Sequence, residues 1–383
     1  MSIIRKLTRW GRGRKKKFQS NMILTIIIAF ISLIGLIILH ELGHFVLAKK
    51  FGVKVEEFGI GYPPRLFGKK IGETIYSLNL LPFGAFVKIY GHEERIEDPR
   101  SFSAKPFYQK SLIILGGVVI FWIVAAILLS IVMGIGVPSA ISDEEGGILK
   151  DPKVQIAAVA SESPAEAAEL KIGDAIIGIK NQELGSKNID KVNEIQEFTQ
   201  AHKGEEVILI IQRGDEIFDV SLIPRVSFPE GEGPMGIALV RTALKSYPWY
   251  IAPVEGVKAT GVLTVAVVRG WGMVFSSLFQ GKGVPPGVEI GGPVRIFELF
   301  VDVGALGTSY FLQFIALISI SLALINILPI PALDGGWFVF LVIEKLKGKP
   351  LNDKIVQKIS ATFFFLLIAL MIWITIKDVI RLF

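Results

Sequence analysis

The chain has 383 residues, enough for a membrane-embedded body together with one soluble domain. Apolar residues make up 51% of it and its mean hydropathy is +0.55, values that exclude an ordinary soluble protein and indicate several membrane spans. The net charge of +6 is not accompanied by a basic face with interleaved aromatic residues, so we expect contact with anionic lipid headgroups and no nucleic-acid partner.

The N-terminal tail, residues 1–20, is basic and has no acidic residue. An uncharged run of 18 residues follows from Met22 to Leu39, long enough to enter a bilayer as a helix. A signal peptide can show a similar pattern. This apolar run is too long for one, however, and it continues into a candidate metal motif that cleavage would remove. We therefore expect a retained first span over residues 21–49.

The first span ends in His40-Glu41-Leu42-Gly43-His44, which has the form H-E-x-x-H. Residues four apart share one face of a helix, so His40 and His44 can each offer a ring nitrogen to one metal ion. A carboxylate at Glu41 lies close to that ion without having to bind it, and can take a proton from water, as in zinc hydrolases. Such a motif also occurs by chance in soluble proteins. Three ionisable residues within a membrane span cost about 2–3 kcal/mol each, which favours a functional site.

Residues 50–110 form a polar, basic loop with a strand-like part. Thr74–Leu80 and Ala85–Tyr90 are rich in strand formers and flank the turn Pro82-Phe83-Gly84, so we expect them to pair as a hairpin. A surface hairpin is one interpretation. The apolar tip, residues 80–86, favours instead a hairpin that enters the membrane where protein or water covers its backbone.

The middle of the chain alternates between membrane and soluble character. A second span is expected over residues 111–138, where Gly116-Gly117 would allow another helix to approach closely. Residues 150–226 read as a small α+β domain, with a short capped helix at 163–168 and a strand pair at 206–223. Residues 245–300 are apolar but interrupted by charges, so we expect one or two helices on the membrane surface and then a loop.

The third span is expected over residues 303–333, followed by a cytoplasmic connector at 334–358 and a final span at 359–377. Pro329 and Pro331 should break the helix just before Asp334. A zinc site needs a third protein ligand, and the chain has no cysteine. His92 is expected in a solvated loop and His202 in the α+β domain. Asp334 is thus the predicted third ligand, and an N-cap of the next helix is its other interpretation.

Together these motifs resemble the site-2 protease family of intramembrane zinc metalloproteases, in particular its bacterial RseP-like members. The resemblance covers nearly everything from residue 22 to the C-terminus. In one respect the sequence departs from the family pattern, because Phe121 stands where an asparagine would follow Gly117. The matching segments are the H-E-x-x-H motif, Leu333-Asp334-Gly335, the preceding Asn326, Pro329 and Pro331, the re-entrant β-loop at 81–88, the PDZ-like Gly173-Asp174, and Gly292-Pro293.

The resemblance implies a mainly α-helical membrane protein with four transmembrane helices, a membrane-re-entrant β-hairpin and one inserted α+β PDZ domain. It implies an intramembrane endopeptidase in which His40, His44 and Asp334 bind Zn²⁺ and Glu41 is the general base. Substrate-binding residues would be Asn326, Phe83 and Gly84. The substrates would be single-pass transmembrane proteins, such as anti-sigma factors or remnant signal peptides, cut in regulated intramembrane proteolysis.

The same resemblance implies a bacterial inner-membrane protein whose PDZ domain lies outside the cytoplasm and binds peptide tails. The basic loops at 49–110 and 344–358 agree with a cytoplasmic position, whereas the basic N-terminal tail would then lie on the other side. A catalytically silent membrane-anchored PDZ scaffold is the alternative function, although a scaffold has no need of Glu41. A metal permease is a weaker alternative, because no span carries repeated carboxylates or histidines.

Overall fold

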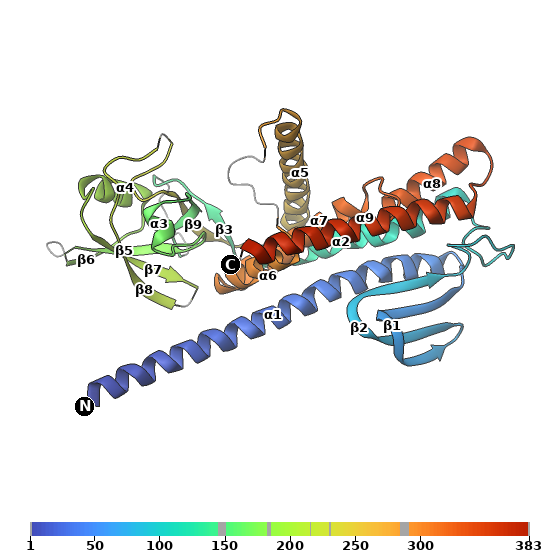
Figure 1. Cartoon of the computed structure of the whole chain (residues 1–383), viewed down its shortest axis with the longest axis horizontal. Helices are drawn as coiled ribbons and strands as arrows, with labels where there is room; N and C mark the ends of the chain where they lie inside the picture. Colours follow the sequence, from blue (N-terminus) through green and yellow to red (C-terminus); the bar gives the residue numbers. More distant parts are fainter. Residues whose placement is uncertain are drawn as a thin grey trace. The chain divides into compact units, whose positions relative to one another are not determined.

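The computed structural model describes residues 2–144, 151–181, 185–214, 216–229, 231–283 and 291–381. These residues belong to two compact units (Figure 1). A helical unit comprises Met1–Leu129, Val257–Phe300 and Ile315–Phe383, and a sheet unit comprises Ser130–Gly256 and Val301–Phe314.

The helical unit contains helices that are long and apolar enough to cross a membrane. By length and composition alone, candidates in the described residues are Leu24–Lys50, Phe107–Ile135, Ala252–Phe279, Thr308–Asn326 and Asp353–Arg381. The helix bounds are α1 Ser2–Lys50, α2 Phe107–Ile135, α5 Ala252–Phe279, α6 Pro293–Ala305, α7 Thr308–Asn326, α8 Asp334–Lys347 and α9 Asp353–Arg381.

Four of these candidates coincide with the four predicted spans. Helix α5 is a fifth candidate in the described residues, so the predicted count of four spans is not confirmed. We expected one or two surface helices there, and the structure has a single unbroken helix. Its charged residues lie on a continuous hydrogen-bonded backbone, which they do not interrupt. Helix α7 ends at Asn326, earlier than the predicted third span, because Pro329 and Pro331 follow it.

Close helix contacts hold this unit together. A Cβ added at Gly43 of α1 would lie 2.5 Å from the carbonyl oxygen of Gly116 of α2, so the small residues let the two backbones touch, as predicted. Helices α2 and α7 share a buried apolar cluster around Ala125 and Ile320, against which α5 packs. In Figure 1 the axis of α5 runs across the direction of α2, α7 and α9.

A two-stranded sheet, β1 (Val55–Ile71) with β2 (Thr74–Ile89), packs beside the end of α1. The predicted pairing of its strands is wrong. Phe58 pairs with both Tyr76 and Val87, so the first half of β1 lies between the two segments that we expected to pair. The second half of β1 pairs with Thr74–Asn79 on the other side. The order across the sheet is 85–89, 55–60, 74–80, 65–71.

The sheet unit has the strand order β3-β9-β4-β5-β7-β8, with β6 paired to β5 (Figure 1). Its core is formed by alternate strand residues such as Val154, Ile156, Leu209 and Ile211. The predicted cap of the first helix is confirmed, since Ser163 Oγ accepts the N–H of Glu166. The element bounds are β3 Val137–Ala140, β4 Lys153–Val159, α3 Pro164–Ala167, β5 Ala175–Asn181, β6 Gly185–Asn188, α4 Val192–Ala201, β7 Val207–Arg213, β8 Glu216–Leu222 and β9 Ile237–Lys245.

This sheet extends beyond the predicted domain of residues 150–226, because β3, which precedes that range in the sequence, and β9, which follows it, both join the sheet at its β4 edge. The predicted strand pair is confirmed as β7 with β8, from Val207 opposite Leu222 to Arg213 opposite Glu216. The unit is therefore an α+β domain assembled around residues 137–245.

Candidate metal centre

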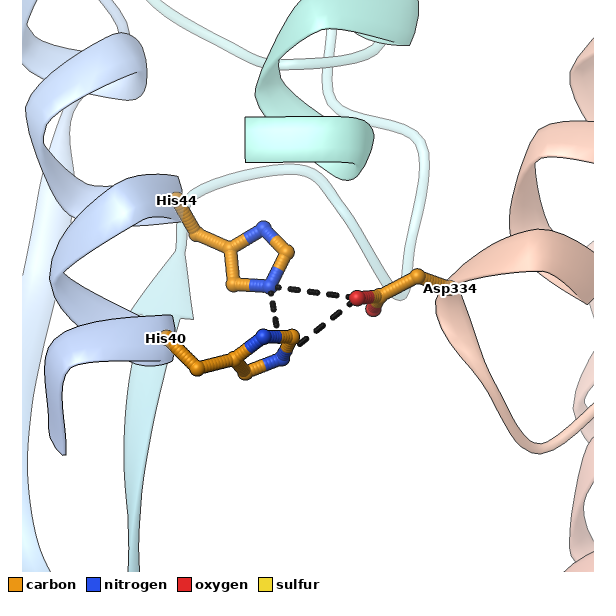
Figure 2. Close-up of side chains that lie close together, drawn as sticks. All are labelled: His40, His44 and Asp334. Carbon is orange, nitrogen blue, oxygen red and sulfur yellow. Dashed lines mark hydrogen bonds and ion pairs between the residues drawn. The ribbon is translucent and has the colours of Figure 1, made fainter. Parts of the chain in front are cut away.

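Three ligand-type side chains from distant parts of the sequence meet inside the helical unit (Figure 2). The Nε2 atoms of His40 and His44 lie 3.2 Å apart. Oδ2 of Asp334 lies 3.4 Å from Nε2 of His40 and 3.5 Å from Nε2 of His44. The three residues predicted from the sequence as metal ligands thus point their ligand atoms at one position.

Helices α1 and α8 supply these side chains in different ways. His40 and His44 stand one turn apart near the end of α1, on the face that turns away from solvent. Asp334 is the first residue of α8, and the N-cap is Leu333, so the alternative interpretation of Asp334 as an N-cap does not hold. A Cβ at Gly335 or Gly336 would lie 2.3 Å or 2.2 Å from a carbonyl oxygen of residues 327–330. The two glycines therefore let α8 start tightly against the turn that follows α7.

A glycine of α2 makes room for both imidazole rings. A Cβ added at Gly117 would lie 2.3 Å from Nε2 of His44 and 2.5 Å from Cε1 of His40. From the sequence we expected Gly116-Gly117 to serve helix packing, and Gly116 does so. The role of Gly117 could not be found from the sequence, because it depends on which residues face it from α1.

The geometry fits a tetrahedral metal ion. Ligand atoms at about 2.0–2.1 Å from a tetrahedral zinc ion stand about 3.3 Å apart, close to the separations found here. Both histidines are buried, at 8% and 7% exposure. Oδ2 of Asp334 is buried as well and has no hydrogen-bond partner among the described residues, which is costly for a carboxylate oxygen unless a cation faces it. The His–His–Asp cluster therefore fits Zn²⁺.

The remaining predicted residues differ in how the structure places them. Glu41 is half-buried beside the three ligands, and the backbone N–H of Val87 donates to its carboxylate. The Asn326 amide donates to the carbonyl of Leu322 at 2.9 Å, within α7. Gly84 has a φ of +96°, which an L side chain rarely adopts, and its α-carbon faces the ring of Tyr62. The side chain of Phe83 lies outside the described residues.

His92 lies in a loop, as predicted, but it is only partly exposed instead of solvated. The ring packs against Trp337 and Phe102, with centroids 4.5 Å and 4.9 Å away. Burial lowers the pKa of His92 to about 4, so the ring is neutral near pH 7. The neighbouring acidic residues, Glu93 and Glu94, suggested a polar loop. The two aromatic partners could not be predicted, because Phe102 and Trp337 are not adjacent to His92 in the sequence. His92 does not belong to the ligand cluster.

Comparison with known proteins agrees with this site. The family model described as Peptidase family M50 matches residues 28–370, a range that includes all three ligands. The chain belongs to this family. The resemblance to site-2 proteases inferred from the sequence motifs is thereby confirmed.

Relatives of the family extend over nearly the whole chain. A Clostridium perfringens protein named as a zinc metalloprotease is 33% identical over 93% of this chain and 98% of its own length. The zinc metalloprotease RasP of Geobacillus kaustophilus is 28% identical over 93% of this chain and 98% of its own length. The chloroplastic membrane metalloprotease ARASP of Arabidopsis thaliana is 29% identical over 98% of this chain and 85% of its own. With its apolar helices, the chain is a multi-pass membrane member of the family.

Proposed function

We propose that this protein is a zinc-dependent endopeptidase that cleaves single-pass transmembrane proteins within the membrane. The observation that carries the proposal is the buried cluster of His40, His44 and Asp334 with Glu41 beside it, at the end of an apolar helix. The names of the relatives as zinc and membrane metalloproteases support it.

Each residue of the cluster has a distinct task in this proposal. Nε2 of His40, Nε2 of His44 and Oδ2 of Asp334 would hold the ion. Bound zinc makes water a nucleophile near neutral pH and polarises a carbonyl group. The Glu41 carboxylate takes the proton of the attacking water and delivers it to the nitrogen of the leaving amine. The Val87 N–H keeps this carboxylate beside the cluster.

A substrate helix must be unwound before its peptide carbonyls can react, because they are hydrogen-bonded within the helix. The 85–89 segment of β2 offers a place to hold the unwound chain, since it forms one edge of its sheet and contains Val87, the neighbour of Glu41. A substrate segment added there as a strand would pass the cluster. Gly84 leaves the start of this edge without a side chain, and Phe83 precedes it. The Asn326 amide has further hydrogen-bonding capacity for the substrate backbone.

The meeting of α1 and α8 supports four membrane crossings. His44 and Asp334 lie side by side and hence at the same depth in the membrane. The chain between them must therefore cross the bilayer an even number of times. Helices α2 and α7 provide two crossings. A crossing by α5 would require another by residues 280–307, where the described helix α6 has 13 residues, about 20 Å, and is too short. Helix α5 would then lie along the membrane surface, and its direction across α2 and α7 agrees with this.

The sheet unit supports the assignment of a single PDZ domain that binds peptide tails. An apolar groove of about 800 Å³ lies between α4 and β9, lined by Ile195, Met235, Ile237 and Leu239 among others. Strand β3 pairs with β9 only from Thr242 onward, which leaves the edge at 237–240 for a short peptide strand. The domain would lie outside the cytoplasm of a bacterial inner membrane and restrict access by size or by tail sequence.

The proposed biological setting is regulated intramembrane proteolysis. Anti-sigma factors or remnant signal peptides, already shortened outside the membrane, would be the substrates. A silent PDZ scaffold remains the alternative function. The gathering of two histidines and a carboxylate at one buried position is a cost that such a scaffold would have no reason to carry.

The proposal is tested with Glu41→Gln. Purified protein, reconstituted in lipid, is assayed for cleavage of a model single-pass substrate, and its zinc content is measured by atomic absorption. We expect wild-type protein to hold one zinc and cleave, and Glu41→Gln to keep its zinc and lose cleavage by about 10²-fold or more. The control is Glu73→Gln, which removes a carboxylate paired with Lys49 at the protein surface. A Glu41→Gln protein that cleaves normally, or that loses its metal, would contradict the assigned role.

A further inference from the structure

The two histidines of the cluster are oriented by different contacts. The Nδ1 atom of His44 lies 2.8 Å from the carbonyl oxygen of Ile113, to which it donates when Nε2 faces the cluster. Such a second hydrogen bond is the usual way in which a metal-binding histidine is fixed. The Nδ1 atom of His40 is buried and makes no hydrogen bond of regular geometry among the described residues, although the backbone of Gly117 lies close to the ring. His40 therefore needs another support for its ring.

That support is the flat face of an aromatic ring. The His40 and Phe121 rings are stacked, with centroids 4.7 Å apart and planes inclined by 20°. On another side, the His44 ring meets His40 edge-on, at 4.7 Å and 88°. Rotation of the His40 ring about its Cβ–Cγ bond would therefore drive it into one of two neighbouring rings.

Phe121 is itself firmly held. Its side chain is only 2% exposed, in the interior of α2. Its carbonyl oxygen accepts a hydrogen bond of 2.8 Å from Ser319 Oγ of α7, and Ser319 is fully buried. One turn further along α2, Ala125 enters the apolar cluster shared with α7. The ring that faces His40 is thus fixed by both helices.

We propose that Phe121 is a positioning residue, which orients His40 toward the metal by stacking, where the ring lacks a regular hydrogen bond like the one that His44 makes. This inference rests on the proposed function, because it assumes that His40 binds zinc. It gives a role to the residue at which the sequence departs from the family pattern. It also makes His40 the ligand whose orientation depends on packing, whereas that of His44 depends on a hydrogen bond.

The test measures zinc affinity, by competition with a chelator, in the full-length protein. Phe121→Leu keeps a buried apolar side chain and removes the flat ring, whereas Phe121→Tyr keeps the ring. We expect the zinc dissociation constant to rise by about 10-fold in Phe121→Leu, in the range known for supporting contacts of metal ligands, and to stay within about 3-fold in Phe121→Tyr. Phe300→Leu, at a fully buried phenylalanine of α6, should leave it unchanged.

Replacing zinc with cobalt provides a spectroscopic measurement that a general loss of protein stability would not change. The visible absorption of the Co²⁺-loaded protein reports the geometry of its ligands, and we expect it to change in Phe121→Leu and to match wild type in Phe300→Leu. In a His40→Ala background, Phe121→Leu should have no further effect on metal affinity. This double variant separates an action through His40 from a general effect on the fold.

The outcomes distinguish the inference from the proposed function. If wild-type protein binds zinc and cleaves its substrate while Phe121→Leu has unchanged affinity and an unchanged cobalt spectrum, the positioning role is refuted and the proposed function stands. Equal losses in Phe121→Leu and Phe121→Tyr, or an undiminished effect in the His40→Ala background, refute it also. If wild-type protein binds no zinc, the proposed function fails and the inference fails with it.

Discussion

Each of the two units holds an aspartate inside it, and the surroundings of the two carboxylates are opposite. In the sheet unit, Asp174 is completely buried and both of its oxygens are occupied. Arg213 donates to them at 2.6 Å and 2.7 Å, and the N–H of Lys171 donates at 2.9 Å. In the helical unit, Oδ2 of Asp334 is buried without a hydrogen-bond partner in the described part of the chain and faces two imidazole nitrogens.

The difference separates a structural carboxylate from a ligand. A buried carboxylate whose hydrogen bonds are complete stabilises the fold around it and has no capacity left for chemistry. A buried carboxylate oxygen that the protein leaves unpaired needs a cation from elsewhere. The two units thus use the same residue type for folding in one case and, in the proposed function, for metal binding in the other.

The largest effect is expected from Asp334→Asn. The amide removes the charge that faces the metal, so zinc affinity should fall by about 100-fold or more and cleavage should stop. Asp302→Asn is the matched control, because Asp302 is a surface residue of the sheet unit paired with Lys171. Atomic absorption and the cleavage assay are run on both proteins. Full zinc occupancy in Asp334→Asn would place the third ligand elsewhere.

The next largest effect is expected from Gly117→Ala. The added Cβ would stand 2.3 Å from Nε2 of His44, so the rings must move and zinc affinity should fall by about 10–100-fold. Gly35→Ala in α1 is the control, since a Cβ there has no neighbour within 4 Å. Chelator competition is measured on both. Equal affinities in the two variants would show that the space at Gly117 is not needed.

Asp174→Asn tests whether the buried carboxylate of the sheet unit has a purely structural role. Removal of the charge opposite Arg213 should lower the free energy of unfolding of the sheet unit by about 2 kcal/mol. Zinc content should be unchanged. Chemical denaturation, followed by protease resistance of the sheet unit, measures the first quantity and atomic absorption the second. Loss of zinc in a folded Asp174→Asn protein would mean that this carboxylate is not purely structural.

The smallest effect concerns His92 and pH. The unfolded chain takes up a proton near pH 6.5, while the folded chain does so only near pH 4, so the stability that neutral His92 provides is present above pH 6.5 and declines as pH falls toward 4. His92→Phe keeps the packing against Trp337 without a titrating group. Between pH 7 and pH 5, the metal-free wild type should lose at most about 2 kcal/mol beyond the loss in His92→Phe. Parallel pH profiles of thermal unfolding would contradict the assigned burial.

The cluster of His40, His44 and Asp334 could be predicted from the sequence because each residue lies at the end of a long apolar run, where an ionisable side chain is costly. His40 and His44 have the spacing of one helix turn at the end of an apolar run, and Asp334 follows prolines after another such run. The helices of the other three predicted spans were equally evident from uncharged runs. Residue type, spacing and hydropathy suffice for features of this kind.

Other features depend on contacts between segments, which a single sequence does not specify. The segments 74–80 and 85–90 look like strand partners, yet Phe58 pairs with both, because β1 folds between them. The roles of Gly117 and Phe121 require knowledge of which face of α2 meets α1. Helix α5 carries charges that suggested interruption, and its length became evident only from the structure.

The small sheet at the end of α1 has two edges of unlike chemistry. Its 65–71 edge carries Arg65, Lys69 and Lys70, and lysines on an edge strand discourage further strands from adding to it. The 85–89 edge begins with Ala85, Phe86 and Val87 and has a single lysine, Lys88, which pairs with Glu56; in the described chain no additional strand pairs with this edge. In the proposed function, an unwound substrate segment would add to the sheet at its 85–89 edge, and the charged 65–71 edge would discourage the same peptide from pairing there.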